Sequence, residues 1–183
     1  FASDGNFTIE LLENSINSDL ANVLGNLVNR TIGMINKYFD GQVENTNVNE
    51  KIDDDLKNTI TSSIATIINK MDEFKIADAL DELFNIFRRC NKYIDETTPW
   101  ILAKDPEKQQ RLKTVLYNLI ESIRIGAVLL QAFLPETSES IFKQINTDKT
   151  TFDSIKTFGE YNSQTVGTPV VLFQRIENDK TNR

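Results

Sequence analysis

Apolar residues recur three or four positions apart through most of the chain, and this spacing predicts helices rather than strands. The pattern divides into five helical segments with short polar connections. These run from Thr8 to the residue before Asp40, from Asp53 to Met71, from Ile76 to Thr98, from Glu107 to Phe133 and from Glu136 to Ile145. The polar run 41–49 is expected to be a loop. We therefore predict an all-α fold, a helical bundle of about five helices.

The width of each apolar stripe predicts where its helix lies in the bundle. Between Asp53 and Met71 the stripe is narrow, so this helix should lie at the periphery. Between Glu107 and Phe133 apolar residues cover a broad face, as expected for the central helix. Residues 147–183 show little periodicity. We therefore divide the chain into a bundle, residues 1–146, and an irregular C-terminal tail, residues 147–183, which either docks on the bundle or is partly disordered.

One polar stripe on the first helix is a candidate binding surface. At 3.6 residues per turn, Asn26, Arg30, Gly33 and Lys37 fall on one narrow face, and the apolar residues of this helix fall on the other. One face should pack while the other is free to bind. An amide, a guanidinium and an ammonium beside a small residue suit a nucleotide base and its phosphate. A surface Asn and a salt-bridged Arg are the alternative reading.

The sole tryptophan, Trp100, follows Pro99 at a predicted bend. Thr98 precedes a proline and is therefore biased away from the helical conformation, which ends the third helix there. An exposed indole at such a bend offers a plane on which a base can stack. The alternative is that the indole only covers the end of the bundle.

The net charge of −7 is unfavourable for RNA binding, because phosphate contacts need Lys and Arg. The distribution of charge weakens this objection. Residues 85–124 hold eight basic and five acidic residues, and this basic excess lies around Trp100. On charge alone, an ordinary solvated helix face is the preferred reading, and a basic patch that serves RNA binding is the alternative.

The chain offers few groups for catalysis. It has no histidine and a single cysteine, Cys90, so it lacks the commonest general base and cannot form an intramolecular disulfide or a zinc site. One cysteine fits a reducing cytosol and a cytoplasmic protein. The acidic residues Asp53 to Asp55 and Asp95-Glu96 are interpreted as helix caps and solvated faces. No stretch is apolar enough to cross a membrane, and a start without methionine indicates a fragment.

Three blocks of sequence carry a resemblance to a known family. They are residues 17–41, residues 91–100 and residues 121–137, in which the pairs Pro99-Trp100 and Gly126-Ala127 and the run Phe133-Leu134-Pro135 stand out. In this order the blocks resemble the anticodon-binding domain of bacterial methionyl-tRNA synthetases, from about Phe7 to Phe142. Weaker similarity continues around Leu172 to Glu177.

The resemblance implies that the domain binds methionine tRNAs at their CAU anticodon. It implies that Trp100, in the pair with Pro99, stacks with the first anticodon base, the cytosine. It also implies that Asn26 and Arg30 meet base edges or phosphate, and Lys37 fits the same groove. Weaker candidates, for contacts to the RNA backbone only, are Arg88, Arg89 and Lys92.

The signature motifs of the catalytic half of these synthetases do not occur in this chain. We therefore expect no cofactor in this fragment and no activation of methionine by it. The parent enzyme would use ATP and Mg²⁺, and zinc can also occur in its catalytic half. The expected partners are methionine tRNAs and the catalytic domain of the same polypeptide. The fragment should be monomeric, because the tRNA-binding barrel of some relatives is lacking.

Two alternatives stay open. One is the anticodon domain of a sister class I synthetase, for isoleucine, valine, leucine or cysteine, which uses a similar bundle. The other is a protein-interaction bundle in which the region of Trp100 docks a protein and has no role in RNA binding.

Overall fold

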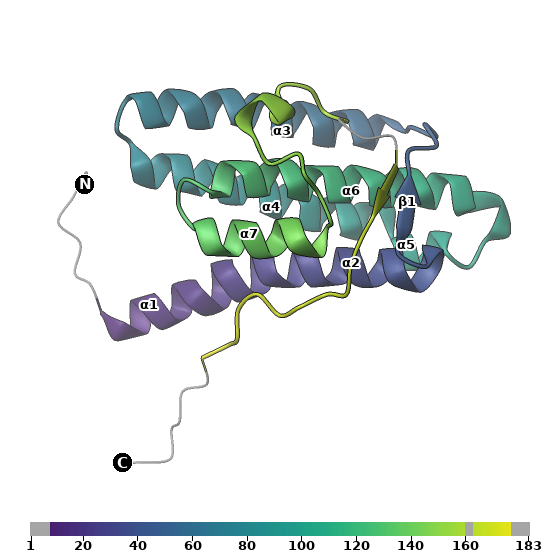
Figure 1. Ribbon diagram of the computed structural model, residues 1–183, viewed down its shortest axis with the longest axis horizontal. Helices are drawn as coiled ribbons and strands as arrows, with labels where there is room; N and C mark the ends of the chain where they lie inside the picture. The colour runs from purple at the N-terminus through teal and green to yellow at the C-terminus, as the bar shows by residue number, and fades with distance from the viewer. Residues whose placement is uncertain (1–7, 160–162, 177–183) are drawn as a thin grey trace, which may run out of the picture.

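The computed structural model describes residues 8–159 and 163–176, and it confirms an all-α bundle (Figure 1). The described residues begin with one long helix made of α1 (Ile9–Ser15), a π-helical segment (Ile16–Gly25) and α2 (Asn26–Phe39). Thr8 caps its start, because the Thr8 hydroxyl accepts a hydrogen bond from the N–H of Leu11 at 3.1 Å. Asp40 adopts the left-handed conformation, with φ at 51°, and ends the helix.

The remaining helices follow in the predicted order. They are α3 (Lys51–Asp72), α4 (Ile76–Thr97), α5 (Pro99–Leu102), a 3-10 turn (Pro106–Lys108), α6 (Gln109–Leu130) and α7 (Pro135–Gln144). α3 begins just before the acidic run that was expected to start it. The reason is a capping box, in which the Asp53 carboxylate accepts a hydrogen bond from the N–H of Glu50 at 2.8 Å.

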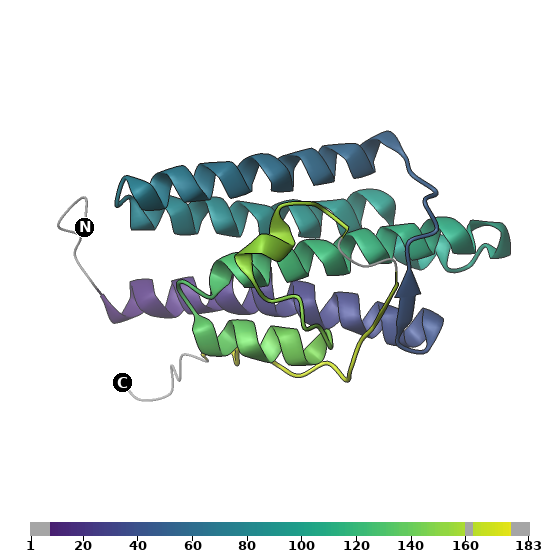
Figure 2. The same cartoon turned by 45° about the horizontal axis from the view of Figure 1, so that its top comes forward.

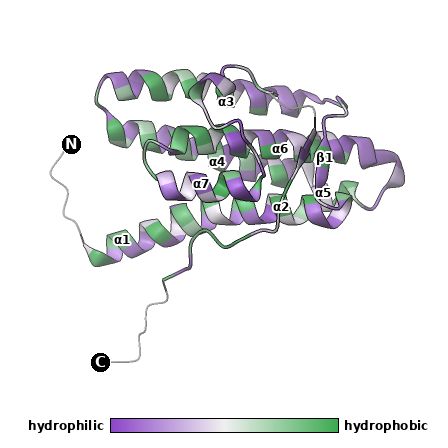
Figure 3. Ribbon diagram, in the orientation of Figure 1, coloured by the Kyte–Doolittle hydropathy of each residue, from purple (hydrophilic) through white to green (hydrophobic). Residues whose placement is uncertain are grey.

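α6 is the central helix of the bundle, as its broad apolar face predicts. Every residue from 114 to 130 is buried, and α2, α3, α4 and α7 pack around it (Figure 2). Gly126 lets α4 approach closely, because a Cβ atom there would lie 2.4 Å from Cε1 of Phe87. α3 contacts chiefly α4 and keeps a largely hydrophilic outer side (Figure 3). Its peripheral position is therefore confirmed.

Two short strands join the polar run after α2 to the C-terminal tail. β1 (Gln42–Glu44) pairs antiparallel with β2 (Ser163–Thr165), and Val43 lies opposite Gln164. The expectation of a loop over 41–49 is therefore wrong at these three residues. Three residues are too few to show an alternating pattern, and the partner strand lies far away in the sequence.

The described part of the tail docks on the bundle. After α7 the chain forms a 3-10 turn (Phe152–Ile155) over α6. Buried Arg124 donates hydrogen bonds to the backbone carbonyls of Lys149 and Ser154, at 2.9 and 2.8 Å. Buried Glu121 accepts one from the N–H of Gly159 at 3.0 Å. An ion pair in the central helix therefore holds the tail through its backbone.

Residues 167–176, which we call the C-terminal strap, run antiparallel along the first helix (Figure 1). At its start, the amide of Asn36 donates to the carbonyl of Gly167 at 2.9 Å. At its end, the side chain of Asn17 exchanges two hydrogen bonds with the backbone of Ile176, at 3.0 and 2.9 Å. The strap therefore covers one edge of the long helix from the end of α2 back to the π-helical segment.

Candidate nucleic-acid interface

α2 presents the polar stripe to solvent and buries its apolar face. Asn26 and Lys37 are exposed, and Arg30 and Gly33 are partly exposed. The residues fully buried on the other side are Leu24, Leu27, Val28, Thr31, Ile32 and Ile35. The predicted division into a packed face and a free face is therefore confirmed. Since each helical residue adds 1.5 Å, the stripe is roughly 16 Å long.

The C-terminal strap borders the stripe on one side. Phe173 and Arg175 of the strap line a groove of 380 Å³ together with Asn22, Asn26 and Asn29 of the first helix. The guanidinium of Arg175 donates a hydrogen bond to the side-chain oxygen of Asn22. Three amide side chains, a guanidinium and an aromatic ring therefore surround one groove, and this mixture can bind a base edge or a phosphate.

α4 borders the stripe on the other side, and Arg30 faces it. Nη2 of Arg30 lies 3.9 Å from Oδ1 of Asp95, and the two side chains are 36% and 71% exposed. Exposed pairs at such distances contribute about 0 to 1 kcal/mol. The guanidinium is thus held in place only loosely and can bind an external phosphate or base edge.

Trp100 lies in the turn between α4 and α6. Thr98 adopts the left-handed conformation, with φ at 42°, rather than the extended conformation that a following proline favours. This conformation is sterically costly for a β-branched residue. Pro99 is buried at the first position of α5, while Trp100 is 39% exposed. The predicted bend is therefore confirmed, with a different backbone conformation, and Trp100 is open to solvent.

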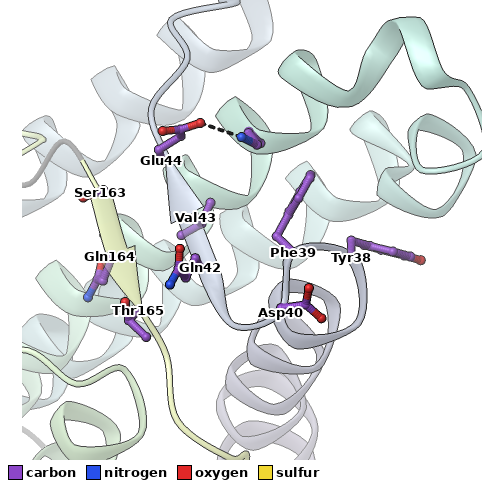
Figure 4. Close-up of a pocket in the computed structure, with 10 residues that line it drawn as sticks. Tyr38, Phe39, Asp40, Gln42, Val43, Glu44, Ser163, Gln164 and Thr165 are labelled. Atoms are coloured by element: carbon purple, nitrogen blue, oxygen red, sulfur yellow. Dashed lines mark hydrogen bonds and ion pairs between the residues drawn. The ribbon is translucent and has the colours of Figure 1, made fainter.

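Trp100 and Lys37 share one end of the bundle. Figure 1 draws α5 at the same end of the bundle as the carboxyl end of α2, and Nζ of Lys113 near the start of α6 lies 5.6 Å from the ring centre of Phe39 at that end. Nζ of Lys37 lies 5.3 Å from the ring centre of Tyr38. Beyond Tyr38 a depression of 470 Å³ separates the end of α2 from the outer side of the two strands, with Phe39 and Thr165 in its walls (Figure 4). The stripe therefore leads from the strap groove at Asn26 towards the end that carries Trp100.

The basic excess of the run 85–124 is largely neutralised, because most of its basic residues lie in ion pairs with carboxylates. Arg111 is buried in an ion pair with Asp53, and Arg124 is buried in one with Glu121. The sequence count misses this neutralisation because Asp53 lies outside the run. Charge within a sequence window therefore overstates the positive charge at the surface.

The three weaker candidates on α4 fall into two groups, because Arg89 and Lys92 share the Glu96 carboxylate whereas Arg88 lies at Asp19. The side chain of Arg89 is only 11% exposed, and its guanidinium lies 2.7 Å from Asp55 and 3.0 Å from Glu96. Arg88 is half-exposed beside the π-helical segment, and Lys92 is exposed to solvent. The structure therefore brings Arg89 and Lys92 together at Glu96 and leaves Arg88 apart from them. Arg89 links α3 to α4, a structural role that leaves its guanidinium little access to an external phosphate.

A buried polar cluster lies at the base of the Trp100 turn, and it corrects the interpretation of Asp53 as a solvated cap. The Asp53 carboxylate is fully buried and accepts two hydrogen bonds from Arg111, at 2.6 and 2.9 Å, and one from the Tyr93 hydroxyl. Burial raises the pKa of Asp53, but the hydrogen bonds from Arg111 and Tyr93 outweigh it, so this pKa lies below its ordinary value. Asp53 is therefore ionised at neutral pH.

Cys90 is buried, and desolvation raises the pKa of its thiol to about 12.

Within residues 8–159 and 163–176, no three His, Cys, Asp or Glu side chains are placed to hold a metal ion. Over the same residues, no helix combines the length and the hydrophobicity that a bilayer crossing requires.

In architecture the chain is a helical bundle closed by a two-stranded sheet and a strap. It belongs to the family described as the anticodon binding domain of methionyl tRNA ligase, whose model matches residues 43–183. The matched stretch includes Trp100 and begins just after α2.

Relatives extend the similarity across the first helix. The methionine–tRNA ligase of Clostridium tetani is 51% identical over 97% of this chain, and that of Bacillus subtilis is 45% identical over 98%. The chain spans 28% of the length of each. The crystal structure of the free methionyl-tRNA synthetase from Mycobacterium tuberculosis matches 97% of this chain with a TM-score of 0.91 at 28% identity, and the match covers 37% of that protein.

Proposed function

We propose that this chain recognises the CAU anticodon of methionine tRNAs. The observation that carries the proposal is the exposed stripe of α2, on which Asn26 and Arg30 face solvent from a helix whose other side is buried. A rigid helix that presents an amide and a guanidinium one turn apart can read an unpaired base and its phosphate with little loss of conformational entropy. The family to which the chain belongs supports the same function.

Each residue has a distinct role in this proposal. Trp100 stacks on the first anticodon base, and such stacking is worth roughly 1 to 3 kcal/mol per base. Asn26 and Arg30 bind base edges or phosphate, and Lys37 adds a phosphate contact at the same end as Trp100. Pro99 holds the tryptophan in place, and Lys92 and Arg88 are left for the RNA backbone.

In the polypeptide to which such a domain belongs, we propose that a separate catalytic domain joins methionine to the tRNA with ATP and Mg²⁺, with zinc also able to occur in that half. The relatives named methionine–tRNA ligase support this, since the chain spans 28% of their length. By itself the chain then activates no methionine. We also propose that it works as a monomer in the cytoplasm, with that catalytic domain and methionine tRNAs as its partners.

The decisive experiment uses the fluorescence of Trp100, the only tryptophan. The chain is titrated with an anticodon stem-loop that carries CAU and with one altered at the first anticodon base. We expect quenching by the CAU loop and much weaker quenching by the altered loop, because stacking places a base against the indole. Equal responses to both loops would mean non-specific electrostatic contact and would contradict base reading.

Alanine variants separate the residues. Asn26→Ala and Arg30→Ala should each weaken binding of the CAU loop by about 1 to 3 kcal/mol, because a base edge or phosphate loses its partner. Asn58→Ala, an exposed asparagine on α3, is the matched control and should bind like the parent. If all three variants bind alike, the site is elsewhere. Absence of any response at low salt would favour a protein-interaction bundle instead.

A further inference from the structure

The buried Asp53 carboxylate lies where three helices meet at the base of the Trp100 turn. Asp53 belongs to α3, Tyr93 to the last turns of α4 and Arg111 to the first turn of α6. Arg111 donates to both carboxylate oxygens, and Tyr93 donates its hydroxyl to one of them. Asn118 of α6 in turn donates its amide to the Tyr93 hydroxyl at 3.3 Å. One ionised group therefore connects all three helices.

The segment that carries Trp100 is suspended between two of these helices. It leaves α4 after Thr97, whose hydroxyl donates to the Tyr93 carbonyl at 2.6 Å, and it enters α6 at Gln109. The Gln109 amide donates to the carbonyls of Ala103 and Asp105, at 3.3 and 3.0 Å. Tyr93 precedes the segment in sequence and Arg111 follows it. Because both side chains bind the Asp53 carboxylate, both ends of the segment are connected to this one group.

These groups cannot touch RNA themselves. Asp53 and Tyr93 are fully buried, and the side chain of Arg111 is 7% exposed and forms ion pairs with both Asp53 and Glu50. Any effect on binding must therefore pass through what the cluster holds in place. The strained left-handed Thr98 also needs such support, because a β-branched residue leaves this conformation unless its surroundings fix it.

We propose that Asp53, Tyr93 and Arg111 are positioning residues, which hold the two ends of the α4–α6 turn so that Trp100 presents its indole to an anticodon base. The statement that the cluster fixes the indole concerns the free protein alone. Only the statement that the indole then meets an anticodon base rests on the proposed function.

Tyr93→Phe is the sharpest test, because it removes one hydroxyl and keeps the ring. Ser63→Ala is the matched control. It also removes a buried hydroxyl that donates to a carboxylate between α3 and α4, from Ser63 to Glu82 at 2.5 Å, but near the middle of α3. Equal helical circular dichroism and similar melting temperatures would show that the two variants are folded equally well.

The first measurement is acrylamide quenching and fluorescence anisotropy of Trp100 without RNA. We expect Tyr93→Phe to change both relative to the parent, and Ser63→Ala to change neither. The second is binding of the CAU stem-loop, which we expect to be about threefold weaker or more in Tyr93→Phe, a fraction of the stacking contribution. If Tyr93→Phe does not differ from Ser63→Ala either in the fluorescence of Trp100 or in binding of the stem-loop, the inference is overturned.

The experiment separates this inference from the proposed function. If the parent does not distinguish the CAU loop from the altered loop, the proposed function fails, while the quenching data still decide whether the cluster fixes the indole. If Tyr93→Phe does not fold, Gln109→Ala replaces it, with exposed Gln110→Ala as its control. Gln109→Ala should loosen Trp100 in the same way, and an unchanged anisotropy there would count against the inference.

Discussion

Arg30 of α2 and Asp95 of α4 form an ion pair across the edge of the polar stripe, with 3.9 Å between Nη2 and Oδ1. The pair is wide and exposed, so it adds little to the stability of the fold. Its carboxylate nevertheless lies beside the guanidinium that we assign to RNA. Asp95 must therefore compete with an incoming phosphate for Arg30, and it repels that phosphate.

Asp95→Asn should strengthen binding of an anticodon stem-loop while changing the free energy of unfolding by less than about 1 kcal/mol. Filter binding at several salt concentrations and urea unfolding measure the two quantities. Asp72→Asn is the control, because it removes the same charge from the far end of the α3–α4 pair. Equal gains in both variants would mean that only net charge matters, and no gain in either would contradict the placement of RNA at Arg30.

Gly33→Ala should stabilise the fold and weaken RNA binding. A Cβ atom at Gly33 meets no atom within 4 Å, and alanine is better than glycine inside a helix by about 1 kcal/mol. The added methyl group would nevertheless stand in the middle of the stripe. Thermal unfolding should show the gain and stem-loop titration the loss. Unchanged binding would mean that no base approaches α2 at this point.

Gly126→Ala should destabilise the fold. Its Cβ atom would lie 2.4 Å from the Phe87 ring, and overpacking of this kind costs about 1 to 3 kcal/mol. Urea unfolding measures the loss. The double variant with Phe87→Leu should recover part of it, because the two side chains compete for one space. If the losses in free energy of unfolding of the two single variants simply add, the close contact of Gly126 on α6 with the Phe87 ring on α4 would be contradicted.

Asp53→Asn should lower the free energy of unfolding by about 3 kcal/mol, because it leaves the buried Arg111 guanidinium with only the exposed Glu50 carboxylate, 3.3 Å away, as an ionic partner. The neighbouring exposed Asp54→Asn loses at most a favourable charge in the first turn of α3, worth about 0.3 to 1 kcal/mol. Denaturation by urea at neutral pH compares the two. Similar losses would show that Asp53 acts only as an N-terminal charge.

The Asp53 carboxylate also makes the stability of the fold depend on pH. The pKa of Asp53 is lower in the folded state than its ordinary value of 3.8, so folding favours the ionised form. This contribution is complete above the unfolded pKa and is lost as the pH falls through the lower, folded pKa. The melting temperature of the parent should therefore drop more steeply below about pH 4 than that of Asp53→Asn. Parallel curves would contradict the depressed pKa.

Cys90 should resist thiol reagents in the folded protein. It is buried, and its pKa is raised to about 12, so almost no thiolate is present at pH 8. Ellman's reagent should react with it only in urea concentrations that unfold the chain. Rapid labelling of the native protein would show that the contact between α4 and α6 opens.

The sequence predicts the helices and their buried faces well, because each face follows from the spacing of apolar residues within that helix. The Thr8 cap, the bend before Trp100 and the exposure of Asn26 all follow from neighbours within a turn or two. What could not be predicted depends on distant partners. The sequence places Asp53 on the surface because its hydrogen-bond donors, Tyr93 on α4 and Arg111 on α6, lie far from it in the chain. The neutralisation of Arg111 could not be predicted for the same reason. β1 was not predicted because it pairs with β2, which lies far away in the sequence.

The strap has a consequence for the order in which the protein is made. Asn17 and Ile176, which bond to each other, are 159 positions apart. During synthesis the first helix leaves the ribosome long before the strap does, and chains fold in that direction. The groove beside Asn26 therefore gains its second wall only after the strap has been synthesised. A chain interrupted before Gly167 would carry the polar stripe of α2 with one side open, so an early termination product would differ from the full chain in affinity for RNA before it differed in helix content.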